Sequence, residues 1–129
     1  MTDLLGEVLR RRSRTFYLSL VILPRPLREP IGLAYLLARA TDTVADTRLL
    51  PRPERLAHLR TLRVAYLGGD ADLAAVGRAC AAHQPLAAER ELLTRVVEAV
   101  ARVEALPAAD REAVRRVLAT ITDGQLFDL

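Results

Sequence analysis

The chain has 129 residues, a length that suits one domain with a hydrophobic core and is too short for two well-packed ones. Hydrophobic residues make up 51% of it and charged residues 27%, which excludes disordered, collagen-like and low-complexity proteins. The 19 basic residues, all of them arginine, exceed the 16 acidic ones by a net charge of only +3, which is a weak argument for a polyanionic partner.

Every predicted element is a helix, because apolar residues recur at three- and four-residue spacing and no alternating strand pattern bounded by turns occurs. The first helix runs from Asp3 to about Leu23, where Pro24 stops it. The second begins within residues 26–30, since proline is tolerated in the first turn of a helix, and continues to about Thr47.

Three further helices are expected in the remainder of the chain. The third follows Pro53 and ends at Gly68, a residue type that commonly terminates helices. Residues 70–85 are expected to form a loop with a short helical piece. A fourth helix covers about 87–106, and a fifth begins at Pro107. Apolar spacing assigns inward faces to Leu92, Leu93, Val96, Val97, Val100 and Val103 in the fourth helix, and to Val114, Val117, Leu118 and Ile121 in the fifth.

The fifth predicted helix reaches Leu129 with no basic last turn and no glycine cap after its final apolar residues. We therefore expect one all-α domain of about five helices whose last element is cut, so that the chain is a fragment of a longer helical bundle. This expectation covers residues 1–129 as a single unit, because no linker divides them.

A single cysteine, Cys80, excludes an intrachain disulfide, and with His58 and His83 it shows no spacing typical of a zinc site. We therefore expect a reducing, cytoplasmic setting. No apolar run approaches the roughly 20 residues that a membrane-spanning helix requires, and Asp3 and Glu7 interrupt any signal-peptide pattern. No nucleic-acid partner is expected either, because no recognition module surrounds the arginines.

Four polar residues fall on one stripe of the second predicted helix. Tyr35, Arg39, Asp42 and Asp46 are separated by steps of four, three and four residues, so that at about 3.6 residues per turn they share one face. The rest of this helix is apolar nearly all round, which is typical of a buried helix. Polar groups on a buried helix are costly unless something pairs them, so the stripe predicts an interior polar cavity or a bound ligand.

The two carboxylates of this stripe, one helical turn apart, are open to more than one interpretation. They suit an ordinary surface or salt-bridged acid pair, a general acid and base, or a site for Mg²⁺, which is typically bound by one or two carboxylates together with substrate phosphates. No proton-transfer target is evident in the sequence, which favours magnesium over acid–base chemistry. Arg39 beside them suits bidentate contact with a phosphate.

The stretch Ser13-Arg14-Thr15-Phe16-Tyr17, followed by residues 35–47 with the sequence YLLARATDTVADT, resembles the opening of the squalene/phytoene synthase family. That family carries a Ser-Arg-Ser/Thr-Phe signature and then a Y-x-x-x-R-x-x-D-x-x-x-D helix. The ending at residues 121–129, with Gly124 and Gln125, resembles a helix that precedes the family's central catalytic tyrosine. The resemblance extends over most of the chain and is specific mainly over residues 13–47.

The resemblance implies an isoprenoid synthase bundle around a deep pocket, where two prenyl diphosphates are joined head to head through a cyclopropyl intermediate. Asp42 and Asp46 would hold Mg²⁺ against the leaving diphosphate. Farnesyl and geranylgeranyl diphosphate both remain open as substrates, and NADPH is expected only if the product is squalene. An apolar pocket would protect the allylic cation from water.

The resemblance also implies roles for five residues around the diphosphate. Ser13 and Arg14 would correspond to the family's diphosphate-contacting pair, and Phe16 would stand near the prenyl chain. Tyr35 and Arg39 would line the same pocket as catalytic residues, with Arg39 also binding substrate.

The family pattern includes a second Asp-rich motif, and this chain ends before one occurs. Asp70 and Asp72 have the wrong spacing and are assigned to a loop. The chain alone is therefore expected to be inactive and to need its carboxy-terminal half or a second chain. A non-catalytic helical interaction domain is the alternative from another class. A third interpretation is peripheral contact with anionic membrane through Arg10, Arg11, Arg12 and Arg14, a patch that is otherwise a solvated helix face.

Overall fold

The structure is a computed structural model that describes residues 22–129, and within this range every regular element is an α-helix. The prediction of an all-α chain is confirmed there. The expected first helix and the arginine patch at residues 10–14 lie outside the described residues. Six helices follow one another along the described range: α3 (Arg25–Ala45), α4 (Arg52–Tyr66), α5 (Leu73–Ala81), α6 (Ala87–Thr94), α7 (Val96–Glu104) and α8 (Ala108–Asp128).

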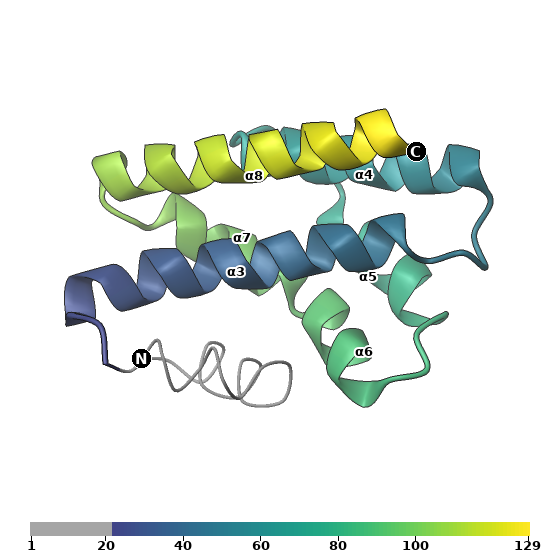
Figure 1. The fold of residues 1–129 in the computed structure, drawn as a ribbon, viewed down its shortest axis with the longest axis horizontal. Coiled ribbons are helices and arrows are strands. Elements are labelled where there is room, and N and C mark those ends of the chain that lie inside the picture. Colours follow the sequence, from purple (N-terminus) through teal and green to yellow (C-terminus); the bar gives the residue numbers. More distant parts are fainter. Residues whose placement is uncertain (1–21) are drawn as a thin grey trace.

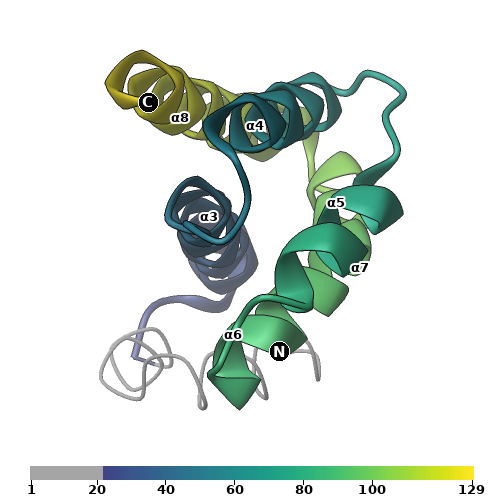
Figure 2. The ribbon, with the colours of Figure 1, turned by 90° about the vertical axis from the view of Figure 1, so that its right-hand side faces the viewer.

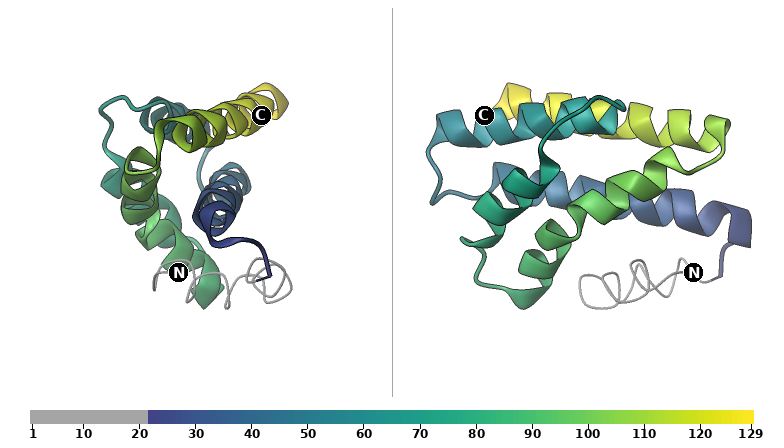
Figure 3. Two further views of the ribbon diagram at one scale, coloured as in Figure 1. Left: turned by 90° about the vertical axis from the view of Figure 1, so that its left-hand side faces the viewer. Right: turned by 180° about the vertical axis from the view of Figure 1, so that it is seen from behind.

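Helix α3 occupies the centre of this arrangement and contacts α4, α6, α7 and α8. Helices α4 and α8 lie side by side along one flank of α3, as Figure 1 shows from the front. Figure 2 looks along these helices and shows α5, α6 and α7 on a second flank, with α3 in the angle between the two layers. The same angle is visible from the opposite end in Figure 3. The apolar faces of α3 are therefore covered from two directions.

A proline precedes both α3 and α4 and a glycine follows α4, close to the predicted bounds, whereas α3 ends at Ala45, two residues before the predicted Thr47. Pro24 and Pro51 directly precede the two helices, where the fixed φ of proline suits a helix start. Helix α4 ends in a left-handed residue, Gly68, with φ 88°. The amide of Gly69 then donates to the carbonyl of Val64 over 2.8 Å, which satisfies a carbonyl group that the helix itself leaves unpaired.

Residues 70–85, which were expected to form a loop with a short helical piece, contain the nine-residue helix α5. Asp72 caps this helix, because its Oδ1 accepts a hydrogen bond of 3.1 Å from the amide of Ala75. Gly77 lies within this helix and permits close packing, since a Cβ at this position would lie 2.5 Å from the carbonyl oxygen of Leu93. The glycine therefore marks a contact between helices and not a turn.

The expected fourth helix is two helices, α6 and α7, which meet at Arg95. This residue has φ −103° and ψ 10°, outside the usual helical range, although its amide still donates to the carbonyl of Glu91 over 3.1 Å. Neither proline nor glycine marks the break. The apolar spacing of Leu92, Val96 and Val100 continues across it, so the sequence pattern cannot reveal it.

The predicted inward faces are mostly correct, with two exceptions. Val97 and Val117 are 46% and 48% exposed, although we expected both to face the core. Val97 follows the buried Val96 and Val117 precedes the buried Leu118, so each points about 100° round the helix from a core residue. The neighbouring helices cover only the narrower stripe that contains Val96 or Leu118. The largest fully buried side chains are Tyr66, Leu33, Leu36, Leu37, Leu59, Leu62, Leu93 and Leu118.

Within residues 22–129, no helix combines the length and the apolar character that crossing a bilayer requires. Cys80 is a free, fully buried cysteine that packs in the core, as expected of a small apolar residue. Burial raises the pKa of its thiol to about 11. His83 is exposed in the turn after α5, and His58 is half-buried on α4.

Candidate functional site

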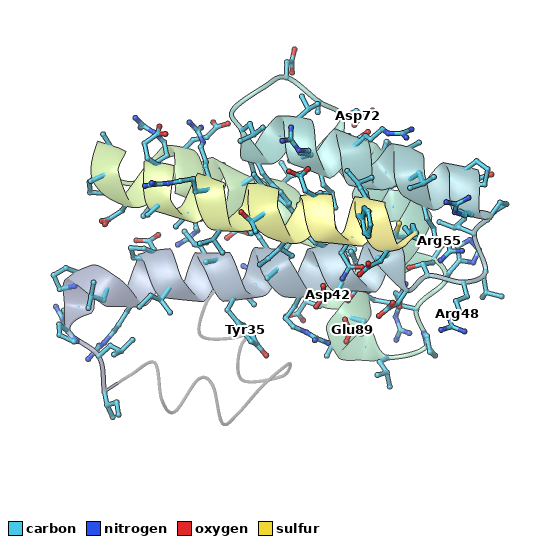
Figure 4. The ribbon with its side chains drawn as sticks, turned by 45° about the horizontal axis from the view of Figure 1, so that its top comes forward. Tyr35, Asp42, Arg48, Arg55, Asp72 and Glu89 are labelled. Atoms are coloured by element: carbon cyan, nitrogen blue, oxygen red, sulfur yellow. The ribbon has the colours of Figure 1, made fainter. Side chains whose placement is uncertain are left out.

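The predicted polar stripe lies along one face of α3 and ends at the carboxyl end of that helix. Tyr35, Arg39 and Asp42 are half-buried, and Asp46 is exposed as the residue that directly follows the helix. Figure 4 shows Tyr35 and Asp42 on α3, with Glu89 of α6 near the Asp42 end and Asp72 well away from them. The structure therefore keeps the four stripe residues together and separates them from the loop acids.

The Asp42 carboxylate is held from two helices. Its Oδ1 accepts a hydrogen bond of 2.8 Å from Nε2 of Gln125 on α8. Its Oδ2 lies 3.7 Å from Nη1 of Arg39, one turn earlier on α3. The side chains of Arg39 and Asp42 are 34% and 35% exposed, so this ion pair is long and open to solvent. The guanidinium Nε of Arg39 is buried and makes no hydrogen bond.

Asp46 stands where a negative charge is unfavourable. The carboxyl end of a helix carries a partial negative charge, and the last turn of α3 contains no basic side chain to balance it. Arg55 of α4 reaches this end, but its guanidinium donates to the carbonyl oxygens of Ala45 and Leu50 over 2.9 and 3.1 Å. No described residue forms a hydrogen bond or ion pair with the Asp46 carboxylate.

Two incompletely balanced carboxylates at the negative end of a helix fit a bound cation. Hard carboxylate oxygens are the ligands that Mg²⁺ prefers, and this ion usually takes only one or two of them from the protein. Among residues 22–129, no group of three or more metal-ligating side chains gathers in one place. Asp42 and Asp46 therefore fit a magnesium ion that draws its other ligands from phosphate and water.

Three threonines beside the stripe fasten α3 to its neighbours, and sequence reasoning did not identify them. Thr41 Oγ1 lies 2.8 Å from the hydroxyl of Tyr66 on α4, and Thr43 Oγ1 donates to Glu89 Oε2 on α6 over 2.8 Å. Thr47, two residues past the end of α3, accepts at its Oγ1 a hydrogen bond of 2.9 Å from Nε2 of Gln84. These bonds satisfy polar groups that the apolar interior would otherwise penalise.

An apolar groove lies along the first half of α3, and its lining contains no residue of the polar stripe. It has a volume of ≈ 250 Å³ and runs between α3 and α8, lined by Leu27, Pro30, Ile31 and Ala34 on one side and by Ala113, Val114 and Val117 on the other. A larger hollow of ≈ 560 Å³ lies between α4 and α5, with His58, Asp70 and Asp72 in its wall. Neither hollow contains a residue of the stripe, so the candidate site is assigned to α3 on the stripe itself, and only the apolar groove shares that helix.

The structure tests only part of the predicted site. Ser13, Arg14 and Phe16, which we expect to bind substrate, lie outside the described residues. Asp70 is exposed in the loop after α4 and Asp72 caps α5, as a structural role predicts for both. Gln125, whose contact with Asp42 crosses 83 positions of sequence, is the residue that sequence reasoning did not assign to the site.

Comparison with known proteins agrees with the resemblance. A family model described as squalene/phytoene synthase matches residues 9–128. A segment of 54 residues, 42% of this chain, is 44% identical to a protein described as Botryococcus squalene synthase from Botryococcus braunii, and the match spans only 12% of that protein's length. No solved structure matches the chain.

Proposed function

Because the chain belongs to the squalene/phytoene synthase family, we propose that it carries the first magnesium-diphosphate site of an enzyme that joins two prenyl diphosphates head to head. The observation that carries this proposal is the placement of Asp42 and Asp46. Both lie on one face near the negative end of α3. Among the described residues, Asp42 has a long, solvent-open ion pair with Arg39 and a neutral hydrogen bond from Gln125, and Asp46 has no ion pair. Such a pair suits a cation that also binds phosphate oxygens.

Each residue of the stripe has a role in this proposal. Asp42 and Asp46 would hold Mg²⁺, which supplies the charge neutralisation that makes diphosphate a better leaving group. Arg39 would contact a phosphate oxygen, and its buried, unbonded Nε supports that role. Tyr35 is partly buried against the core and would line the pocket.

The apolar groove supports a prenyl chain as the organic part of the substrate. Its lining from α3 and α8 is hydrophobic apart from Asp110, and on α3 it extends from Leu27 to Ala34, on the amino-terminal side of the stripe. A hydrocarbon chain in such a groove would lie away from water, which protects a reactive cation. Farnesyl and geranylgeranyl diphosphate are both candidates, and a squalene-type product would require NADPH as reductant.

We further propose that these residues form only one side of the complete active site. No third carboxylate gathers with Asp42 and Asp46 among residues 22–129. The second diphosphate would then take its ligands from another segment or another chain. Positioning two substrates contributes effective molarities of about 10⁵ M or more, so the 129-residue chain alone should bind a prenyl diphosphate without forming a C30 or C40 hydrocarbon.

Calorimetry with a non-hydrolysable prenyl thiodiphosphate tests this function. Binding should require Mg²⁺ and should disappear in the Asp42→Asn, Asp46→Asn double variant. Asp70→Asn is the matched control, because it removes one exposed carboxylate from a loop outside the stripe. Binding that persists in EDTA or in the double variant would refute the metal assignment. Product formation by the chain alone, at a rate that Asp42→Asn abolishes, would refute the incomplete site.

A helical interaction domain is the second candidate, and the exposed apolar residues favour it. Leu27, Ile31 and Val117 are 46%, 39% and 48% exposed around the groove, where another helix would fit. The same calorimetry separates the two functions. An interaction domain would show no magnesium-dependent heat with either prenyl thiodiphosphate.

A further inference from the structure

Gln125 makes the one described hydrogen bond from another helix to the Asp42 carboxylate. It lies in the last turn of α8, and its Nε2 donates to Asp42 Oδ1 over 2.8 Å in a partly buried contact. Helices α3 and α8 pack against each other along their lengths, so the glutamine is carried by a rigid element and not by a loop. A short bond from a fixed donor restricts the rotation of the Asp42 side chain.

Gln125 is a neutral donor, and this distinguishes Asp42 from Asp123, whose carboxylate is bound by a charged side chain of another helix. Asp123, on the same helix as Gln125, is paired with Arg63 of α4, whose Nε and Nη2 donate to Oδ1 and Oδ2 over 2.6 and 3.3 Å. That fork occupies both oxygens with a full positive charge. Gln125 occupies one oxygen of Asp42 and brings no charge, and Arg39 lies 3.7 Å from the other.

We propose that Gln125 is a positioning residue that orients Asp42 for a divalent cation while leaving its negative charge available. This inference rests on the proposed function, since it deepens the role of the same site. Groups that hydrogen-bond to a metal ligand fix its orientation, and their removal typically lowers metal affinity about 10- to 100-fold. A cationic donor in the same place would orient the carboxylate equally well and compete with the metal for its charge.

The chain contains a matched control for this idea. Gln84 also donates from Nε2 to a side chain just past the carboxyl end of α3, the hydroxyl of Thr47, over 2.9 Å. The two hydrogen bonds are nearly equal in length, and replacing either glutamine with methionine removes one of them. Only Gln125→Met removes a hydrogen bond from a carboxylate of the site.

We would measure Mn²⁺ affinity of the full chain by electron paramagnetic resonance, with Mn²⁺ in place of Mg²⁺, and thermal stability by circular dichroism. Gln125→Met should lower the affinity about 10-fold, and Gln84→Met should leave it within twofold. Gln125→Lys should melt at or above the temperature of Gln125→Met but bind Mn²⁺ more weakly still. A merely structural role would instead make affinity follow stability across the three variants, and that result would overturn the proposal.

The side-chain amide signals in ¹H–¹⁵N NMR spectra separate this inference from the proposed function. Without any metal, Asp42→Asn should shift the amide signals of Gln125 and leave those of Gln84 in place. If the unaltered chain binds no Mn²⁺ but this shift occurs, the proposed metal site is wrong and the hydrogen bond stands as a structural contact only, which also rejects positioning. If the shift does not occur, the contact is not formed in solution and the inference fails.

Discussion

The hydroxyl groups of Thr41 and Tyr66 lie 2.8 Å apart in the buried contact between α3 and α4, directly beneath the helix face that carries Asp42. Both hydroxyls also lie within hydrogen-bonding distance of the Leu37 carbonyl oxygen, at 2.8 and 3.3 Å. Tyr66 is 2% exposed, and burial raises the pKa of its hydroxyl well above the ordinary value. Tyr66 therefore stays protonated at neutral pH and fastens α3 to α4.

Replacing this tyrosine with phenylalanine should lower the free energy of unfolding by about 1 kcal/mol, the usual net contribution of a buried hydrogen bond. Thr41 keeps its own bond to the Leu37 carbonyl, so no buried donor is left unpaired. Urea denaturation of Tyr66→Phe, Thr41→Val and the double variant measures the coupling between the hydroxyls. Strictly additive losses would show that the contact does not stabilise the fold.

Stability should fall at alkaline pH because two buried groups resist ionisation. The Cys80 pKa is raised from 9.0 to about 11, and the Tyr66 pKa is raised above 10.0. Unfolding lets each group ionise at its ordinary value, so the stabilisation is complete below pH 9.0 and is lost as the pH rises through the folded pKa. Denaturation measured at several pH values in this range should show a smaller loss of unfolding free energy with rising pH for Cys80→Ala than for the unaltered chain. An equally steep loss in that variant would contradict the assignment.

Two glycines should respond to alanine in opposite directions. Gly77→Ala places a Cβ 2.5 Å from the Leu93 carbonyl oxygen, and the backbone there cannot move aside cheaply, so we expect a loss of about 1–3 kcal/mol. Gly124→Ala meets nothing within 4 Å on helical α8 and should gain about 0.5–1 kcal/mol. Thermal melts of the two variants provide the comparison, and a stable Gly77→Ala protein would show that α5 packs less closely on α6.

Asp46→Asn should stabilise the metal-free chain and abolish its response to Mg²⁺. Removing a negative charge from the negative end of α3 is expected to raise the free energy of unfolding by about 0.3–1 kcal/mol at low ionic strength. Melting temperatures with and without Mg²⁺ test both halves of this prediction. A destabilised variant would mean that Arg55 already balances the Asp46 carboxylate more closely than the hydrogen bonds of Arg55 to backbone carbonyls indicate.

The sequence predicted α3 closely because its determinants are local. Prolines near residues 24–30 start the helix, and the four-three-four spacing of polar residues places Tyr35, Arg39, Asp42 and Asp46 on one face whatever surrounds them. The contact between Asp42 and Gln125 depends on how two distant helices pack, and no spacing rule connects residues 83 positions apart.

The errors in the sequence prediction share a physical cause. Gly77 reads as a loop residue unless the carbonyl that approaches it is known, and the break at Arg95 leaves the apolar period intact. In both places packing between helices decides the local conformation, and local propensity only permits it. Val97 and Val117 were misplaced for the same reason, because their exposure depends on how wide a stripe the neighbouring helices cover.

The contact of α3 with α8 also determines how late in synthesis the apolar faces of α3 can be covered. Helix α3 leaves the ribosome long before α8 does, and its apolar faces have to wait for α7 and α8 to cover them. The entropic cost of closing the loop between α3 and α8 grows by only about 0.6 kcal/mol for each doubling of its length. The long separation therefore delays this contact but lowers the stability of the fold only slightly. A newly made chain therefore exposes the apolar faces of α3 until α8 packs against them, and Asp42 gains its hydrogen bond from Gln125 only at that late step.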